Sequence, residues 1–252
     1  ASVAVSIVHL AKGRTVEGTE TYLDGVRVRD IDSYLRSQRE RSSPLSLSVN
    51  SRLVFQGAVT QGSGFVITPQ ERDDLVGRDP RNAERARPFL GGDEVNSRPD
   101  QSFTRYVIYF GDMSLDDARQ WPELLRIVEE RVKPERDLLR DDQASARASK
   151  AKWWQFWAPR TESFKSIAHL GHCLVTAIVS KHLMFSFQST DRIFSHKLYV
   201  FPFEQLSPFA ILQSRVHVPW AWLLSSTLEE RLNYSASDCF VTFPFPQPDP
   251  RT

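Results

Sequence analysis

The chain has 252 residues, of which 40% are hydrophobic and 25% are charged. This length and apolar content suit a folded protein with a sizeable core and exclude an intrinsically disordered chain. The 32 basic and 31 acidic residues nearly cancel, so any affinity for nucleic acid must come from local clusters of charge.

Cysteine usage and apolar patterning limit the class of protein. The two cysteines, Cys173 and Cys239, are too few for the disulfide framework of a small secreted domain. No apolar run reaches the roughly 18 to 20 residues of a membrane span, and no signal-type apolar core follows a basic start. We therefore expect a cytoplasmic protein with no membrane partner.

Residues 1–44 predict short strands followed by a linker. Residues 1–8 alternate like a strand, the stretch up to Gly25 has the composition of a hairpin, and residues 26–28 are a candidate return strand. The polar residues 36–44 are typical of a linker. Because an opening strand without a partner is a poor start for a domain, we expect truncation at both ends, with a short tail at 247–252.

We expect the main domain to span residues 45–246, and its first half mixes strands with helices. Residues 53–67 are strand-like and interrupted by glycines. Residues 68–71 have the cap, the first-turn proline and the glutamate of a helix N-terminus, which predicts a helix starting there. A second short helix is expected over 79–92, and a strand over 106–110.

The second half of the domain predicts helices around a group of strands. Ser114 and Asp117 form another capping pair, and apolar residues recur at helical spacing up to Val132. A helix is also expected over 207–222. Apolar, β-branched and aromatic runs predict an antiparallel meander at 173–179, 183–187 and 193–203. This order indicates an α+β fold with a mixed, largely antiparallel sheet and flanking helices.

A cluster of basic and aromatic residues lies in the segment 147–165. Cations beside exposed rings suit nucleic acid, because Lys and Arg neutralise phosphates while rings pack against sugars or unstacked bases. The alternative is that the tryptophans anchor a helix to the core while the charges are solvated. The candidate DNA-binding residues of this segment are Lys150, Lys152, Trp153, Trp154 and Gln155.

A second candidate lies in a polar gap between two predicted strands, at Ser180, Lys181 and His182. Lys can donate to guanine acceptors in the major groove, and Ser or His can reach several base edges. An ordinary polar turn is the more common explanation of such residues, and the sequence leaves both interpretations open.

No catalytic or metal site emerges from the sequence. His169, His172 and Cys173 are close together, but no further pair of ligands accompanies them, so we expect no metal. Helix caps and solvated faces explain most carboxylates, and a nucleophile elbow is absent. The Gly62 to Gly64 stretch leads into more strand, which does not suit a nucleotide-binding turn. An independent hydrolase is therefore disfavoured.

Several short motifs occur in order along nearly the whole chain. They are FVITP at 65–69, RDPRNA at 78–83, NSRPD at 96–100, VKPER at 132–136, KWWQF at 152–156, and SDCF at 237–240 with TFPFP at 242–246. Together they resemble the target-recognition part of MmeI-like methyltransferases, a group that includes type IIL restriction-modification enzymes and phage-exclusion methyltransferases.

The resemblance implies sequence-specific recognition of double-stranded DNA, in cis to a Rossmann-like domain that uses S-adenosylmethionine to methylate adenine N6. Residues 1–8 resemble the last strand of that catalytic domain, so residues 1–44 would be its remnant plus a linker. Asn96 and Arg98 lie in a family motif and join the candidate DNA-binding residues, with a role either in loop architecture or in DNA contact.

Two motifs of the family's catalytic domain are missing from the chain. These are the glycine-rich cofactor motif and the Asn-Pro-Pro-aromatic motif that holds the flipped adenine. The resemblance therefore implies a fragment that binds no cofactor and is inactive alone, with S-adenosylmethionine bound by the parent enzyme. The alternative function is a protein-interaction domain, in which tryptophans dock against a partner in a restriction-modification or phage-defence complex.

Overall fold

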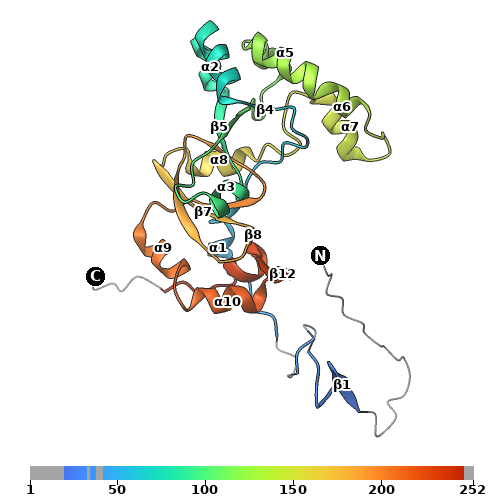
Figure 1. Ribbon diagram of the computed structural model, residues 1–252, viewed down its shortest axis with the longest axis vertical. Helices are drawn as coiled ribbons and strands as arrows, with labels where there is room; N and C mark the ends of the chain where they lie inside the picture. Colours follow the sequence, from blue (N-terminus) through green and yellow to red (C-terminus); the bar gives the residue numbers. More distant parts are fainter. Residues whose placement is uncertain (1–19, 33–34, 38–41, 247–252) are drawn as a thin grey trace. The chain divides into compact units, whose positions relative to one another are not determined.

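The computed structural model describes residues 20–32, 35–37 and 42–246 (Figure 1). The chain divides into two compact units, Ala1–Leu45 and Ser46–Thr252. The strand expected at residues 1–8 and the tail expected at 247–252 lie outside the described residues.

The first unit contains a β-hairpin. Strand β1 (Thr21–Leu23) pairs antiparallel with β2 (Val26–Val28). The two turn residues are Asp24, with φ 49°, and Gly25, with φ 77°. Asp-Gly adopts this left-handed pair readily, and the resulting turn matches the twist of the two strands. The return strand expected at 26–28 is confirmed.

Three sheets form the framework of the second unit. The first has the order β10-β5-β6-β4, with β4 (Val66–Ile67), β5 (Ala86–Leu90), β6 (Arg105–Ile108) and β10 (Ile193–Phe194). The second has the order β3-β11-β7-β9, with β3 (Phe55–Gln56), β7 (His172–Ala177), β9 (Phe185–Ser189) and β11 (Leu198–Phe201). The third has the order β12-β13-β8, with β8 (Val179–Ser180), β12 (Ser226–Leu228) and β13 (Arg231–Asn233). All pairings between these described strands are antiparallel except that of β10 with β5, which confirms the α+β class.

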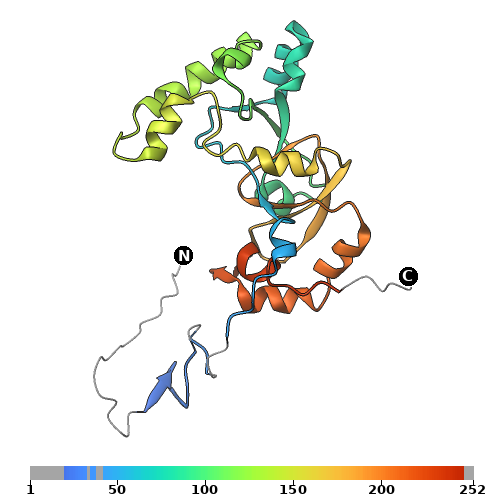
Figure 2. The same ribbon diagram turned by 180° about the vertical axis from the view of Figure 1, so that it is seen from behind.

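Helices flank these sheets. They are α1 (Ser48–Ser51), α2 (Pro69–Arg78), the 3-10 helix η1 (Pro80–Glu84), α3 (Gly92–Ser97), α4 (Leu115–Ala118), α5 (Pro122–Arg131), α6 (Lys133–Asp137), α7 (Ala144–Ala151), α8 (Thr161–Ile167), α9 (Leu206–Leu212), α10 (His217–Leu224) and the π-helix η2 (Ala236–Phe240). Within the second unit, α2 and α5 to α7 lie at one end, and α9 and α10 lie at the other (Figures 1 and 2).

Helix α2 begins where the sequence predicts. The Thr68 hydroxyl accepts from the Glu71 amide at 3.1 Å, and the Thr68 amide donates to the Glu71 carboxylate at 2.7 Å. Each bond satisfies a backbone or side-chain group at the helix end. Arg131 of α5 pairs with the same carboxylate at 2.6 Å. The local capping pattern therefore also connects α2 to α5.

Two expected helices are wrong in part. The segment 79–92 forms η1 and then β5, because residues 86–89 pair with β6 in the interior of the first sheet. The segment 207–222 breaks between α9 and α10, where the Ser214 hydroxyl accepts from the amides of Val216 and His217. At residues 86–89 pairing with another strand overrides helix propensity, and at Ser214 a local bond from the side chain to the backbone interrupts the helix.

The expected meander is also corrected. Strand β7 lies between β9 and β11, so the strands are not arranged in sequence order. The run 193–203 divides into β10 and β11, which belong to different sheets. A tight turn separates them, because the Ser195 carbonyl accepts from the Leu198 amide at 2.9 Å.

The chain crosses between the first two sheets at Gly57 and Ala58. The Ala58 amide donates to the Phe194 carbonyl at 2.8 Å, and the His196 amide donates to the Ala58 carbonyl at 2.8 Å. A Cβ atom on Gly57 would lie 2.2 Å from the Ser195 carbonyl oxygen. Only glycine therefore fits this backbone approach without displacement.

We predict that Gly57→Ala lowers the free energy of unfolding by about 1 to 3 kcal/mol, because the added methyl forces the two backbones apart. Gly77→Ala is the matched control: Gly77 lies in α2, and a methyl group added there would meet no described atom within 4 Å, so we expect a gain of about 0.5 to 1 kcal/mol. Urea denaturation measures both. Equal stability of Gly57→Ala and the wild type would contradict the close crossing.

The first residue of α10, His217, is a fully buried histidine. His217 is 0% exposed, and its Nε2 lies 3.0 Å from the Tyr234 hydroxyl and 4.0 Å from the Cys239 sulfur. Burial lowers the pKa of His217 to about 4 and raises the pKa of Cys239 to about 12. The cluster is therefore neutral at physiological pH, as burial in an apolar core requires.

We predict that this histidine makes the protein less stable in acid. Unfolded His217 takes up a proton near pH 6.5 whereas the folded form resists until about pH 4. The contribution of neutral, buried His217 to the free energy of unfolding is complete above about pH 6.5. About 2 kcal/mol of this contribution is lost by about pH 5. Urea denaturation across this range should show a flatter pH dependence in His217→Gln than in the exposed-site control His182→Gln. Identical pH profiles would contradict the prediction.

Candidate nucleic-acid interface

A groove with a volume of about 390 Å³ lies on the second unit, where α3, β8 and β13 meet. Its lining residues are Asp93, Asn96, Ser97, Val179, Ser180, Lys181, His182, Met184 and Arg231. The groove therefore unites two of the candidate segments, Asn96 and the Ser180 to His182 turn, which are far apart in sequence.

Backbone and side-chain bonds hold the walls of the groove together. The Asn96 amide nitrogen donates to the Val179 carbonyl at 2.9 Å and so connects α3 to β8. Strand β8 in turn pairs with β13, with Ser180 opposite Leu232. Because Asn96 uses one donor in this bond, it contributes to the architecture of the groove as well as to its lining.

An ion pair between the buried Glu94 and the partly exposed Arg105 anchors α3. Glu94 is 6% exposed, its carboxylate accepts from the Gly91 amide at 3.0 Å, and Arg105 of β6 pairs with it at 3.0 Å. A buried carboxylate needs such partners, since losing its hydration without them costs several kcal/mol. Asp93, which precedes Glu94 in the sequence, and Asn96, which follows it, are both exposed.

The groove combines cations with groups that can read a ligand. Lys181 and His182 are exposed, and the side chain of Arg231 is 47% exposed and pairs with Glu229 at 3.0 Å. Ser180 is 4% exposed, and its hydroxyl has no hydrogen-bond partner among the residues that the structure describes. A buried hydroxyl without a partner is uncommon and suits a site that a ligand or water completes.

The Arg98 side chain belongs to the loop after α3. Its Nε donates to the Ser102 hydroxyl at 3.0 Å and lies 3.6 Å from the Asp100 carboxylate. Gln101 of the same loop lies 3.8 Å from the Met184 sulfur, and Met184 lines the groove. This geometry favours a role for Arg98 in loop architecture.

The basic and aromatic segment is divided between core and surface. Trp154 and Gln155 are each 8% exposed, and both donate to the Met113 carbonyl, at 2.9 and 2.7 Å. Trp153 is half-buried against the apolar core that contains Trp154, and the Lys133 ammonium lies 5.3 Å from its ring centroid. The side chains of Trp154 and Gln155 are therefore largely buried and hydrogen-bonded within the fold, which weighs against the prediction that they contact DNA.

Lys150 and Lys152 lie at the end of α7 and do not line the groove. Lys150 pairs with Asp141 at 2.8 Å, whereas Lys152 is exposed. The backbone carbonyl of Lys152 accepts from the buried Arg136 at 3.0 Å, and so does that of Ser149 at 3.2 Å. Arg136 thus caps α7 by donating to backbone carbonyls, and burial lowers its pKa to about 10.

Sequence reasoning missed five lining residues: Asp93, Ser97, Val179, Met184 and Arg231. Asp93 and Asn96 are spaced to share one face of a helix, but the expected helix ended at residue 92, so α3 was not predicted. Arg231 reaches the groove through the pairing of β13 with β8, which no local pattern indicates.

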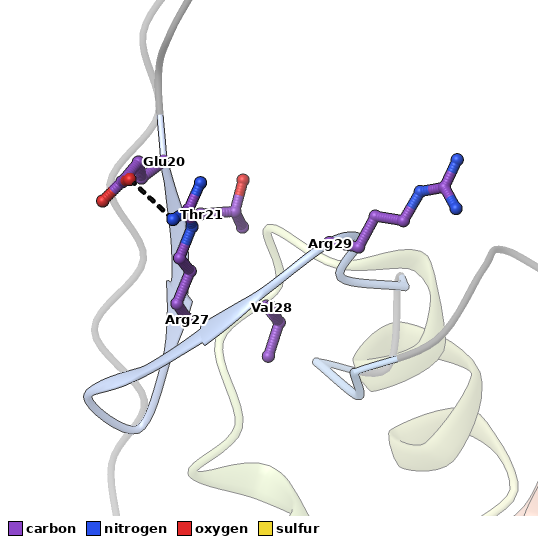
Figure 3. Close-up of a pocket in the computed structure, with 5 residues that line it drawn as sticks. All are labelled: Glu20, Thr21, Arg27, Val28 and Arg29. Atoms are coloured by element: carbon purple, nitrogen blue, oxygen red, sulfur yellow. Dashed lines mark ion pairs between the residues drawn. The ribbon is translucent and has the colours of Figure 1, made fainter.

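A second concavity, with a volume of about 430 Å³, lies on the hairpin of the first unit (Figure 3). It is lined by Glu20, Thr21, Arg27, Val28 and Arg29. The Arg27 and Glu20 side chains pair at 3.0 Å, and Figure 3 shows Arg29 extending away from them. With its carboxylate already paired, this concavity presents no converging set of reactive groups among its described residues.

The part of the chain that the structure describes holds no cluster of three or more His, Cys, Asp or Glu side chains arranged for a metal ion. Cys173 is buried, and burial raises the pKa of its thiol to about 12. None of the described helices has the length and apolar character needed to cross a membrane.

We predict that Trp154→Phe lowers the free energy of unfolding by about 1 to 3 kcal/mol, since it removes a buried donor and leaves a gap in the core. Trp153→Phe is the matched control, and we expect a loss below about 1 kcal/mol because this ring is half-buried. Thermal or urea denaturation compares the two. A larger loss for Trp153→Phe would contradict the assignment of Trp154 to the core.

Comparison with known proteins places the chain in a family. Residues 38–247 match the family model "MmeI, target recognition domain". The chain is 23% identical over 203 residues to DNA methyltransferase A of Bacillus subtilis (strain 168), covering 78% of this chain and 21% of that protein. It resembles the type IIL restriction-modification enzyme MmeI, solved in complex with DNA, with a TM-score of 0.67 and 22% identity over 90% of this chain and 29% of that one. The chain thus spans less than a third of either relative. Because the family model covers most of its length, the chain belongs to the MmeI target recognition domain family.

Proposed function

We propose that this chain is the double-stranded DNA recognition module of a site-specific DNA adenine-N6 methyltransferase of the restriction-modification type. The observation that carries the proposal is the groove, in which Asn96, the Ser180 to His182 turn and Arg231 converge in a chain of the target recognition family. The relatives are named a DNA methyltransferase and a restriction-modification enzyme solved with DNA, which supports the choice of ligand.

The groove suits DNA for two physical reasons. Cationic side chains such as Lys181 and Arg231 can neutralise phosphates and so position the backbone. The antiparallel ribbon of β8, β13 and β12 has the form that the major groove admits, and its polar side chains can reach base edges there. Lys152 is exposed at the end of α7 but does not line the groove, so we assign no DNA contact to it.

The catalytic part of the enzyme belongs, in this proposal, to a longer parent protein. We assign residues 45–246 to DNA recognition, 1–44 to a remnant of the catalytic domain plus a linker, and 247–252 to a tail. The parent would use S-adenosylmethionine in the cytoplasm, in defence against phage. The glycines at 62 and 64 do not fit that cofactor, because other side chains already fill the space beside them. A Cβ atom added at Gly62 would lie 2.6 Å from the Glu135 carboxylate, and one added at Gly64 would lie 2.7 Å from a Val132 methyl group.

The tryptophans weigh against a docking domain as the alternative. Trp121 and Trp154 are buried in the apolar core that residues of β4, β5, β6 and α5 form, and Trp220 donates to the Cys239 carbonyl at 3.0 Å. These rings contact the chain's own interior, so their number does not indicate a surface for a protein partner.

We predict that the chain binds duplex DNA with an affinity that falls with salt by about 0.9 log unit per log unit for each neutralised phosphate. If Lys181 contacts a phosphate, Lys181→Ala should reduce this salt dependence by the share of one phosphate. If Lys181 contacts a base, the variant should relax the sequence preference at one base pair. Anisotropy titration of a fluorescent random duplex pool, followed by sequencing of the bound fraction, measures both effects.

The matched control is Lys165→Ala, which removes an exposed lysine of α8 that pairs with Glu162 outside the groove. We expect it to bind like the wild type. Absence of binding even at low salt would contradict the proposed function, and equal effects of the two lysine variants would contradict the placement of the interface.

A further inference from the structure

We propose that Asp93 determines specificity in the groove by accepting a hydrogen bond from the exocyclic amino group of an adenine or cytosine in the DNA major groove. The inference rests on the proposed function, since it assigns one lining residue of that groove to one chemical feature of the DNA.

The position of Asp93 is rigidly set. It lies in the first turn of α3, and its neighbour Glu94 holds that helix to the first sheet through Arg105 at 3.0 Å. Three residues further on, Asn96 connects the helix to Val179 at 2.9 Å. Residues at this spacing share one face of a helix, so Asp93 and Asn96 present their side chains to the same groove.

The fold itself asks little of Asp93. Its side chain is 80% exposed, and its ion pair with Lys197, at 3.9 Å, is also exposed. Exposed pairs of this kind contribute little to stability, and the carboxylate that caps α3 belongs to Glu94. A carboxylate also repels phosphates, so a surface built only to attract the DNA backbone has no use for it.

The chemistry of a carboxylate matches a particular base edge. An ionised carboxylate only accepts hydrogen bonds. In the major groove, the amino groups of adenine N6 and cytosine N4 are donors, whereas guanine O6 and thymine O4 are acceptors that a carboxylate repels. Asp93 therefore selects adenine or cytosine on the strand that faces it.

The groove shows independent signs of an incomplete site. The buried Ser180 hydroxyl lines the same groove without a partner among the described residues. Lys197 neutralises Asp93 without a close hydrogen bond, since their charged atoms are 3.9 Å apart. The carboxylate can therefore exchange this contact for a base without breaking a strong bond.

The test is selection from a random duplex pool by the whole chain, comparing the wild type with Asp93→Asn and Asp93→Ala. The wild type should select a motif with adenine or cytosine at one position. Asp93→Ala should lose that preference by about 5- to 150-fold, the usual effect of one base contact. Asp93→Asn keeps an oxygen acceptor but adds an N–H donor, so it should also tolerate guanine or thymine at that position. Asp116→Asn is the matched control, because Asp116 is 84% exposed, lies in the first turn of α4 and pairs with Arg119; it should keep the motif.

A change in the DNA provides the second arm. The amino group at the selected position is deleted, with purine in place of adenine or pyrimidin-2-one in place of cytosine. This deletion should weaken binding by the wild type and leave Asp93→Ala unaffected. Selection of the wild-type motif by both Asp93 variants would overturn the role of Asp93 alone. A wild-type chain that binds without sequence preference would overturn the proposed function and this inference with it.

Discussion

The close crossing of Gly57 and Ala58 over the turn after β10 is the constraint on which the rest of the second unit depends. Two backbone hydrogen bonds of 2.8 Å join Ala58 to Phe194 and His196, and they leave no room for a side chain at Gly57. The crossing brings the first sheet, which leads into α3, against the second sheet, which leads into β8. Because α3 and β8 are the two walls of the groove, the geometry of the candidate interface follows from this contact between backbones.

In the proposed function, the groove separates the two tasks of a DNA-reading surface. The chain carries a formal net charge of only +1, so attraction to DNA must be local, and in the proposed function Lys181 and Arg231 would supply it at the groove. Discrimination between bases requires groups with fixed donor or acceptor character. Asp93 and Asn96 are such groups and lie on α3, which the ion pair of Arg105 with the buried Glu94 anchors. The proposed binding and reading would therefore come from separately supported elements.

Local patterns in the sequence predicted local structure well, whereas long-range pairing could not be predicted from them. The capping residues Thr68 and Glu71 predicted α2 because the bonds between them span only three residues. The segment 86–90 was mistaken for helix because its partners, β6 and β10, are distant in sequence. Likewise the Ser180 to His182 turn was found from composition, whereas Asp93 and Arg231 were missed. The tryptophans of 153–154 were ambiguous for another reason: core and interface use the same aromatic residues.

The central claim is that DNA lies in the groove of α3, β8 and β13 and not along the basic and aromatic segment. Amide hydrogen exchange of the whole chain, with and without a selected duplex, tests this most directly. The account predicts protection by DNA over residues 92–97, 179–184 and 226–233, while the amides of 147–165 exchange as in the free chain. Protection concentrated in 147–165, with the groove segments unchanged, would contradict it.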